Sequence, residues 1–592
     1  MKIKILLVLA ILGFASCSEF LDEKIYSSIE AEQMFQDYEN ADMAVQGVYS
    51  SLTTRNGYGL AIQAICSYGT DEARCYFATN ASVNGYFYRI SNYSHSAADV
   101  PITSMWNNLY KGIASANDVF HKVERMTNIS REQKNQLQAE VSFLRGYYYF
   151  IIVQLWGPAR LTTEEPNKTN ALNTNVTRAS VKKIYEQIIE DLNFAKEWLP
   201  DAWSPSYAGR VTKYSAYGML SKVYLTMASG ARFGVAGYDE FDSIQYYSQA
   251  KEEADIVVYD RLHVGNAPML LSDYSQIFSI HNKHNREILF EANFAVGGPT
   301  SIWGKLGGPG KKATASDEYK FQNYGEVGRS YVRPTAYLSL YIYGNEHSVV
   351  DGSLMAAQSD DIRFENNIVP YQLVRVDAQG NRTWGDVRKD PTFWEAYKFS
   401  LKQAAMDGFT WNNTPMNQPI LRFAEVLLIH SEAAGMLNLN DPEAYYGINK
   451  VRARARRNGT DPEYLKDYSV ASFKNEYEFL DAVLDERMRE LCFEGQRRQD
   501  LLRTARLHKA IKQMERIDRE LSSLYGDTSG VLSKNAIKSD ITNQRFDINL
   551  QPYHILLPIP QSEMNIVSNP DYKQNPGWVA VAIEDDDVNE GA

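Results

Sequence analysis

Three glutamates near residue 490 have the spacing that comes closest to a catalytic arrangement. Glu486, Glu490 and Glu494 recur every fourth residue, which places them on one face of a helix. Glycoside hydrolases use a pair of carboxyl groups that flank the glycosidic bond and catalyse its hydrolysis together. However, arginines stand among and directly after these glutamates, and opposite charges at helical spacing attract one another; they are Arg487, Arg489, Arg497 and Arg498. We therefore predict a structural network of ion pairs at this position.

The sequence carries no other signature of catalysis or of metal binding. Residues 307–312 look like a phosphate loop, but the first glycine is misplaced and Lys312 stands where Ser or Thr would reach magnesium. The nine histidines form no His-Glu-x-x-His motif, and no cysteine pair has metal-ligand spacing. A nucleophile and its base could still meet in space. We expect a binding protein rather than an enzyme, with no cofactor and no metal.

The first 22 residues have the parts of a secretory signal. Lys2 and Lys4 precede an apolar run over residues 5–14, which is shorter than the roughly 20 residues that span a membrane. Cys17 follows two small residues, as in bacterial lipoprotein signals, although Phe14 stands where such signals usually have Leu. We predict a signal peptide over 1–16, lipid on Cys17 and a tether over 17–35. The alternative is an ordinary cleaved signal.

Composition excludes some partners and leaves others open. The formal net charge of −12 argues against a nucleic-acid partner and against electrostatic binding to anionic lipid. The 39 tyrosines and 9 tryptophans suit helix packing and contact with sugar or peptide equally. Cys66 and Cys75 could form a disulfide outside the cytoplasm, but two small buried side chains are the simpler interpretation. Cys492 lies in a helical pattern and is expected in the core.

Most of the chain has the apolar period of helices, with Ala and Gly where helices would touch. This pattern resembles tetratricopeptide-type helical hairpins, which stack to bury a shared face. The expected helices cover residues 33–52, 102–119, 131–155, 181–199, 212–227, 242–257, 419–434, 444–456 and 473–505. The acidic end at 584–587 is expected to be disordered. The predicted fold class is mainly α.

Two long stretches lack the helical period. Residues 53–100 combine Gly, Asn and Ser with interleaved aromatics, which is typical of a long ordered loop. In residues 260–415 we expect a strand at 287–292, a short helix at 335–343, and strands and turns over 368–399. Loops of such length are usually functional.

Five motifs follow one another along the chain, at Trp106–Asn117, Pro419–Ala433, Ile448–Ala455, Asp485–Arg503 and Leu557–Trp578. Taken together and in this order, they resemble the SusD/RagB family of outer-membrane nutrient-binding lipoproteins. The resemblance covers essentially the whole mature chain, and Phe20-Leu21-Asp22 after Cys17 agrees with it. The charged residues of these motifs, such as Arg422, Glu425 and Glu432, are interpreted as structural pairs, and Pro558-Ile559-Pro560 as an extended segment that closes over the scaffold.

The resemblance implies a single SusD-like domain over 36–592. Its tetratricopeptide-like scaffold would occupy about 36–260 and 415–578, with irregular, partly β binding insertions at about 53–100 and 260–415. The protein would be lipid-anchored on the cell surface at the outer membrane, would cap a SusC-like TonB-dependent transporter, and would hand it glycan without cleaving it. A peptide-binding member of the family is the alternative, and a surface glycan hydrolase is a distant third.

Family members present ligand-binding residues from two regions, which match the two loop-rich stretches of this chain. A sugar site needs aromatic faces and a few planar polar groups. By position, the candidates are Asp71, Arg74, Tyr86 and Tyr88 in the first region, and Trp303, Tyr324 and Trp384 in the second. For each residue the alternative is packing under its own loop, but we expect at least two to be exposed on one face.

Overall fold

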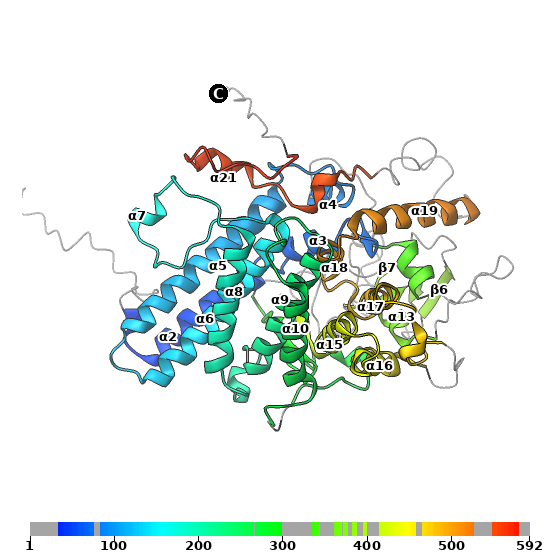
Figure 1. Cartoon of the computed structure of the whole chain (residues 1–592), viewed down its shortest axis with the longest axis horizontal. Helices are drawn as coiled ribbons and strands as arrows, with labels where there is room; N and C mark the ends of the chain where they lie inside the picture. The colour runs from blue at the N-terminus through cyan, green and yellow to red at the C-terminus, as the bar shows by residue number, and fades with distance from the viewer. Residues whose placement is uncertain are drawn as a thin grey trace, which may run out of the picture.

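A computed structural model of the protein is mainly helical, and the sheets in its described residues are two-stranded (Figure 1). The predicted fold class is therefore confirmed. Several positions named above lie outside the residues that the structure describes; they are Cys17, Trp303, Tyr324 and segments 307–312 and 584–587. The described residues are 33–75, 83–263, 265, 267–298, 333–343, 360–369, 371–376, 382–387, 395–399, 414–457, 464–525 and 548–578.

A stack of helices forms the scaffold, and each helix packs against the next. α5 packs on α6, α6 on α8, α9 on α10, α10 on α15 and α15 on α16, and the blue-to-green helices lie side by side in Figure 1. The bounds are α2 (Tyr38–Thr53), α5 (Val100–Arg125), α6 (Arg131–Trp156), α8 (Val181–Trp198), α9 (Lys213–Arg232), α10 (Ser243–Val258), α15 (Phe423–Leu437) and α16 (Glu443–Ala455). These helices agree closely with the helical periods of the sequence.

Local signals determine where the scaffold helices begin and end. Ser130 accepts a hydrogen bond from the Gln133 backbone and opens α6 with a capping box, as Thr212 does for α9. Gly157 ends α6 with a φ of 69°, a conformation that glycine adopts without strain.

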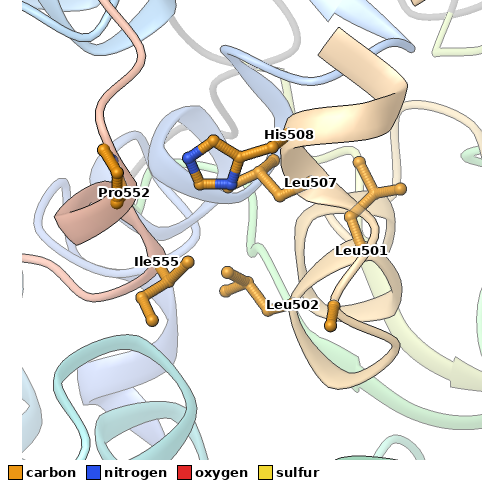
Figure 2. A pocket seen from close by; sticks show the side chains of 7 residues that line it. Leu501, Leu502, Leu507, His508, Pro552 and Ile555 are labelled. Atoms are coloured by element: carbon orange, nitrogen blue, oxygen red, sulfur yellow. The ribbon is translucent and has the colours of Figure 1, made fainter. Parts of the chain in front are cut away.

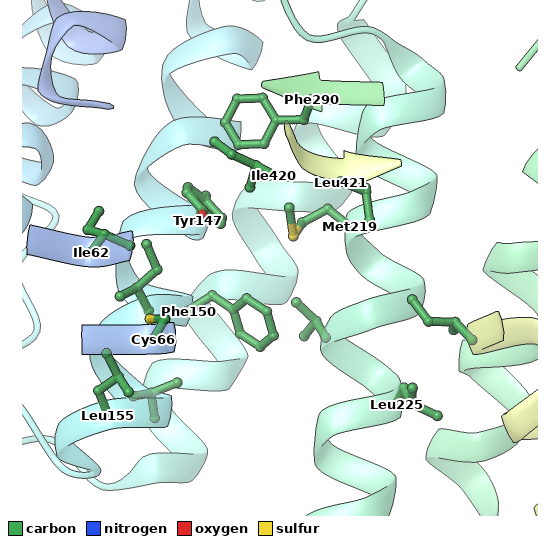
Figure 3. Close-up of a cluster of buried hydrophobic side chains, with 14 of the residues drawn as sticks. Ile62, Cys66, Tyr147, Phe150, Leu155, Met219, Leu225, Phe290, Ile420 and Leu421 are labelled. Carbon is green, nitrogen blue, oxygen red and sulfur yellow. The ribbon is translucent and has the colours of Figure 1, made fainter. Parts of the chain in front are cut away.

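A single cluster of buried hydrophobic side chains runs from Ala41 to Tyr572. Figure 3 shows side chains that meet there from segments far apart in the sequence. Tyr147 and Phe150 of α6 lie near Met219 of α9, and Phe290 lies beside Ile420. The two loop-rich stretches therefore share the core of the scaffold.

Short strands join the insertions to the scaffold. β2 (Ile288–Ala292) pairs antiparallel with β8 (Gln418–Arg422), directly before α15, so the strand predicted at 287–292 is confirmed. β1 (Ala73–Arg74) pairs with β3 (Arg333–Pro334), which brings the first insertion against the second. The strands and turns expected over 368–399 are present where that stretch is described; they are β4 (Ile368–Val369), β5 (Tyr371–Val376), β6 (Arg382–Val387) and β7 (Glu395–Ala396).

Three element predictions were wrong. Residues 53–100, expected to be a loop, contain two helices, α3 (Ala61–Ser67) and α4 (Val83–Ser91). The helix expected from Pro419 begins only at Phe423, because residues 418–422 form a strand that pairs with β2. The single helix expected over 473–505 is interrupted by two turns, at Phe493 with a φ of 65° and at Ala505 with a φ of 53°. It is divided into α17 (Glu476–Leu491) and α18 (Arg497–Arg503), and α19 (Leu507–Tyr525) follows.

The C-terminal segment closes over the scaffold, as predicted. The Trp156 indole donates to the Pro558 carbonyl at 2.9 Å, and the Leu557 amide donates to the Leu155 carbonyl at 2.7 Å. This segment holds η9 (Pro552–Ile555) and α21 (Gln561–Ile566). Across the described residues, no helix is both long enough and apolar enough to cross a membrane.

The three described cysteines are buried free thiols, in agreement with the simpler interpretation. Burial raises the pKa of the Cys66 thiol to about 11 and that of Cys492 to about 12. Both thiols are therefore protonated and unreactive at neutral pH.

Candidate functional site

The three glutamates of the helix-spaced motif lie in a buried network of ion pairs. Arg422, 1% exposed, donates to both carboxylate oxygens of Glu494 at 2.7 Å and to Glu490 at 3.0 Å. Arg363 lies 2.7 Å from Glu486 and 3.0 Å from Glu490. The predicted structural network is therefore confirmed, and α17 is attached through it to β8 and to α13 (Ile362–Asn367).

The electrostatics of this network oppose catalysis by these carboxylates. Burial alone would raise the pKa of Glu486, but the guanidinium groups of Arg363 and Arg452 outweigh it and lower the pKa to about 2. A glycosidase needs one carboxylic acid with a raised pKa and access to substrate. The motif glutamates offer neither. No cluster of His, Cys, Asp or Glu in the described part of the chain could hold a metal ion.

A polar cavity of about 260 Å³ lies where η6, α17, α18 and α19 meet. We call it the Tyr341 pocket. η6 is a short π-helix (Tyr337–Ile342) within the second insertion, at the position of the predicted short helix. The pocket is lined chiefly by aromatic and charged side chains; those that concern its chemistry are Asp71, Tyr337, Tyr341, Asp481, Asp485, Arg497, Arg506, Lys509 and Gln513.

Two tyrosines one turn apart form an aromatic platform in the pocket. Tyr341 is 59% exposed, and its ring stacks on buried Tyr337 with centroids 5.0 Å apart and an interplanar angle of 18°. The Thr335 hydroxyl accepts from the Leu338 amide at 3.0 Å and donates to the Asp71 carbonyl, which anchors the start of η6. An exposed, fixed aromatic face is what the C–H side of a sugar ring requires.

Most of the charged groups in the pocket are already paired. Arg497 donates to both oxygens of Asp71, at 2.8 and 2.7 Å, and Arg506 lies 2.6 Å from Asp481. Asp485 is half-buried and, among the described residues, has no hydrogen bond or ion pair. Lys509 and Gln513 project one turn apart from α19. The pocket thus combines an aromatic face with both donors and acceptors.

A second cavity, of about 380 Å³, is apolar (Figure 2). It lies between the α18–α19 segment and η9, and Leu501, Leu507 and Ile555 face it. His508 is its polar member, with Nε2 3.0 Å from the Gln551 carbonyl. An aliphatic surface without convergent polar groups would not orient a sugar, so the Tyr341 pocket is the better candidate.

Of the four residues predicted for binding in the first insertion, one lines the pocket. Asp71 lines the pocket, but it is 1% exposed and its carboxylate is held by Arg497. Arg74 is buried in β1, opposite Arg333. Tyr86 and Tyr88 are half-buried on α4, where the Arg89 guanidinium lies over Tyr86 and Tyr88 packs against the core. Neither tyrosine lines the pocket.

In the second insertion, the structure describes the backbone of one predicted residue. Trp384 lies in β6, paired with Leu373 of β5, and Trp303 and Tyr324 lie outside the described residues. A role in ligand binding, and exposure of at least two members on one face, stays a prediction for the set of seven.

The pocket adds three candidates that the sequence analysis did not select. Tyr337 and Tyr341 fall in the predicted short helix, and their spacing of four was an available signal. Asp485 is the first residue of a motif that was interpreted as wholly structural. Its neighbour Glu486 is buried in the network, whereas Asp485 faces the pocket.

Two family models match the sequence. A model described as "SusD family" matches residues 287–578, and a model described as "Starch-binding associating with outer membrane" matches residues 19–225. Together they cover most of the chain. The SusD-like protein P25 of Formosa agariphila is 27% identical over 615 aligned residues, which cover 100% of each chain.

Solved structures share this fold. A SusD homologue from Bacteroides thetaiotaomicron VPI-5482 superposes with a TM-score of 0.74 at 24% identity and covers 93% of this chain and 99% of its own. A laminarin-binding SusD-like protein superposes with a TM-score of 0.63 at 22% identity and covers 91% and 99%.

Proposed function

Because the chain belongs to the SusD/RagB family, we propose that it is a cell-surface protein that binds glycan without cleaving it. The observation that carries the proposal is the exposed Tyr341 ring, which stacks on Tyr337 in a pocket that Asp485, Lys509 and Gln513 also line. A structural neighbour named for laminarin binding supports a glycan ligand. The absence of cleavage is supported by the motif carboxylates, which are buried and paired with arginines.

The test is glycan binding by the purified protein and by two tyrosine variants. Native gels that contain laminarin, xylan or galactan, followed by calorimetry on the best ligand, should reveal binding without release of reducing sugar. Tyr341→Ala should weaken the affinity by about tenfold, because the loss of a central aromatic contact commonly costs this much. Tyr477→Ala is the matched control, since Tyr477 is 46% exposed on α17 and lies outside the pocket.

Two results would contradict this proposal. Equal binding by the wild type and Tyr341→Ala would place the site elsewhere. Binding of a peptide library in preference to every glycan, with the same dependence on Tyr341, would identify a peptide-binding member of the family.

We further propose that the bound glycan passes to a SusC-like TonB-dependent transporter while lipid on Cys17 holds the protein at the outer membrane. The family description that mentions the outer membrane supports this location, and its match begins at residue 19, shortly after Cys17. Co-purification of the transporter with the full-length protein from detergent-solubilised outer membranes is the expected result. Recovery of the protein without a transporter under mild detergent would contradict the partnership.

A further inference from the structure

The charges that line the Tyr341 pocket are not equally available to a ligand. Two of its three cations are held by carboxylates, Arg497 by Asp71 and Arg506 by Asp481. Asp485 has no hydrogen bond or ion pair with any part of the chain that the structure describes, and its side chain is half-buried. A ligand group that enters the pocket therefore meets a carboxylate that no described residue binds directly.

Two nearby arginines compensate the charge of Asp485 only in part. Burial raises the pKa of Asp485, Arg489 and Arg497 oppose this rise, and Asp71 and Asp481 add to it. Both arginines have other partners: Arg497 donates to Asp71, and the Nε of Arg489 donates to the Ile342 carbonyl at 2.8 Å. Asp485 is therefore the carboxylate of the pocket that no described cation binds directly.

Lys509 is the remaining cation of the pocket, and its exposure to solvent limits how strongly it can attract an anionic ligand. It is exposed on α19 and forms no ion pair with a described residue. Solvent and salt screen exposed charges much more than half-buried ones. Attraction by the exposed Lys509 is therefore weaker than repulsion by the half-buried Asp485.

From this arrangement we propose that the Tyr341 pocket takes uncharged glycans and rejects anionic ones, with Asp485 as the specificity-determining residue. The proposal rests on the glycan-binding function proposed above. The Asp485 carboxylate would accept hydrogen bonds from sugar hydroxyls, which are donors. A carboxylate or sulfate on the sugar would instead place a second negative charge beside it, and such like-charge contacts suppress binding.

The experiment compares neutral polysaccharides with their sulfated forms. Laminarin, xylan and galactan, each beside a sulfated preparation of the same polymer, are titrated into the wild type, Asp485→Asn and Glu478→Gln. The wild type should bind its neutral ligand at least about tenfold more tightly than the sulfated form. Asp485→Asn should reduce this preference to about threefold or less, because the amide keeps a hydrogen-bond acceptor without the charge. Glu478→Gln removes the same charge from an exposed position on α17 and should keep the full preference.

The possible failures can be told apart. Equal affinity of the wild type for neutral and sulfated forms would overturn the charge preference. A full preference in Asp485→Asn would overturn the role of Asp485. Tighter binding of the sulfated form, lost in Lys509→Gln, would show that the opposite charge controls the pocket. If the wild type binds neither form of any polymer, the proposed glycan-binding function fails, and this proposal with it.

Discussion

A buried charge is stable only when its partners surround it, and Arg422 illustrates this at the scale of one residue. Its guanidinium forms ion pairs with Glu287, directly before β2, with Glu490 of α17 and with Glu494 in the turn after α17. The arginine therefore joins the second insertion to the C-terminal helices. Such networks give modest net stability when intact but are costly to break, because they leave unpaired charges in the interior.

Arg422→Met should lower the free energy of unfolding by about 3–5 kcal/mol, since three buried carboxylates lose a common partner. Chemical denaturation followed by circular dichroism measures the change. Arg131→Met is the matched control, because Arg131 pairs with Glu124 where both side chains are exposed, and such pairs contribute at most about 1 kcal/mol. Similar losses in the two variants would refute the structural role of the network.

The buried carboxyl group of Glu72, which follows the pocket residue Asp71 in the sequence, should make the free energy of unfolding depend on pH. It accepts from the Phe493 amide at 2.8 Å, and burial raises its pKa from 4.5 to about 8. Between these values the folded state holds a proton that the unfolded chain has released. The stability that this proton contributes is complete below about pH 4.5 and declines as the pH rises to about 8, by about 1.4 kcal/mol per pH unit.

Glu72→Gln should remove this contribution, so that the free energy of unfolding falls less steeply between pH 5 and pH 8. Burial also raises the pKa of Glu140, to about 7. Because Glu140 is unchanged in the variant, part of the fall in unfolding free energy remains in both proteins. Urea denaturation at several pH values measures the two slopes. Parallel curves for the variant and the wild type would show that Glu72 is ionised in the folded state.

At the scale of elements, the scaffold depends on close contacts between helices. Gly447 of α16 lies against α15, where an added Cβ would be 2.0 Å from the Leu427 carbonyl oxygen. The Ile448 amide also donates to the Ser431 hydroxyl at 2.9 Å across this contact. A backbone oxygen cannot move aside as a flexible side chain can, so this contact fixes the distance between the two helices.

Gly447→Ala should therefore destabilise the protein by about 1–3 kcal/mol, the usual cost of overpacking a close contact. Gly47→Ala makes the same chemical change in α2, at a position with nothing within 4 Å of the added Cβ. There the better helix propensity of alanine should stabilise the protein by up to about 1 kcal/mol. Opposite signs in thermal unfolding are the expected outcome, and destabilisation by both changes would contradict the packing argument.

At the scale of the whole molecule, the C-terminal segment joins parts that are far apart in the sequence. Asn575 donates to the carbonyls of Trp156 and Leu557, and its own side-chain oxygen accepts from Arg178. The two insertions meet each other through β1 and β3. The Tyr341 pocket, lined by Asp71 of the first insertion and by η6 of the second, therefore lies where the two insertions meet.

Lipid on Cys17 would give this molecule its position in the cell. Cys17→Ala should abolish labelling by radioactive palmitate and release the protein from the outer-membrane fraction, because the predicted anchor is lost. Fractionation and immunoblotting measure the release, with Cys492→Ala as a control that alters a buried thiol. Retention of Cys17→Ala in the membrane would contradict the lipoprotein prediction.

The sequence alone determined the features that repeat over short distances. Helical period predicted the scaffold helices, although α5 and α9 extend five or six residues further than expected, and the glutamates spaced by four among arginines predicted the ion-pair network. Tertiary structure decided which residues share a cavity. Four residues of the pocket lie apart in the chain: Asp71, Tyr341, Asp485 and Lys509. No local pattern shows that Arg497 binds Asp71, whereas Asp485 forms no ion pair with a described residue. Strand pairing at Pro419 and the turn at Phe493 likewise depend on partners distant in sequence, so an apolar period by itself indicated helix at both places.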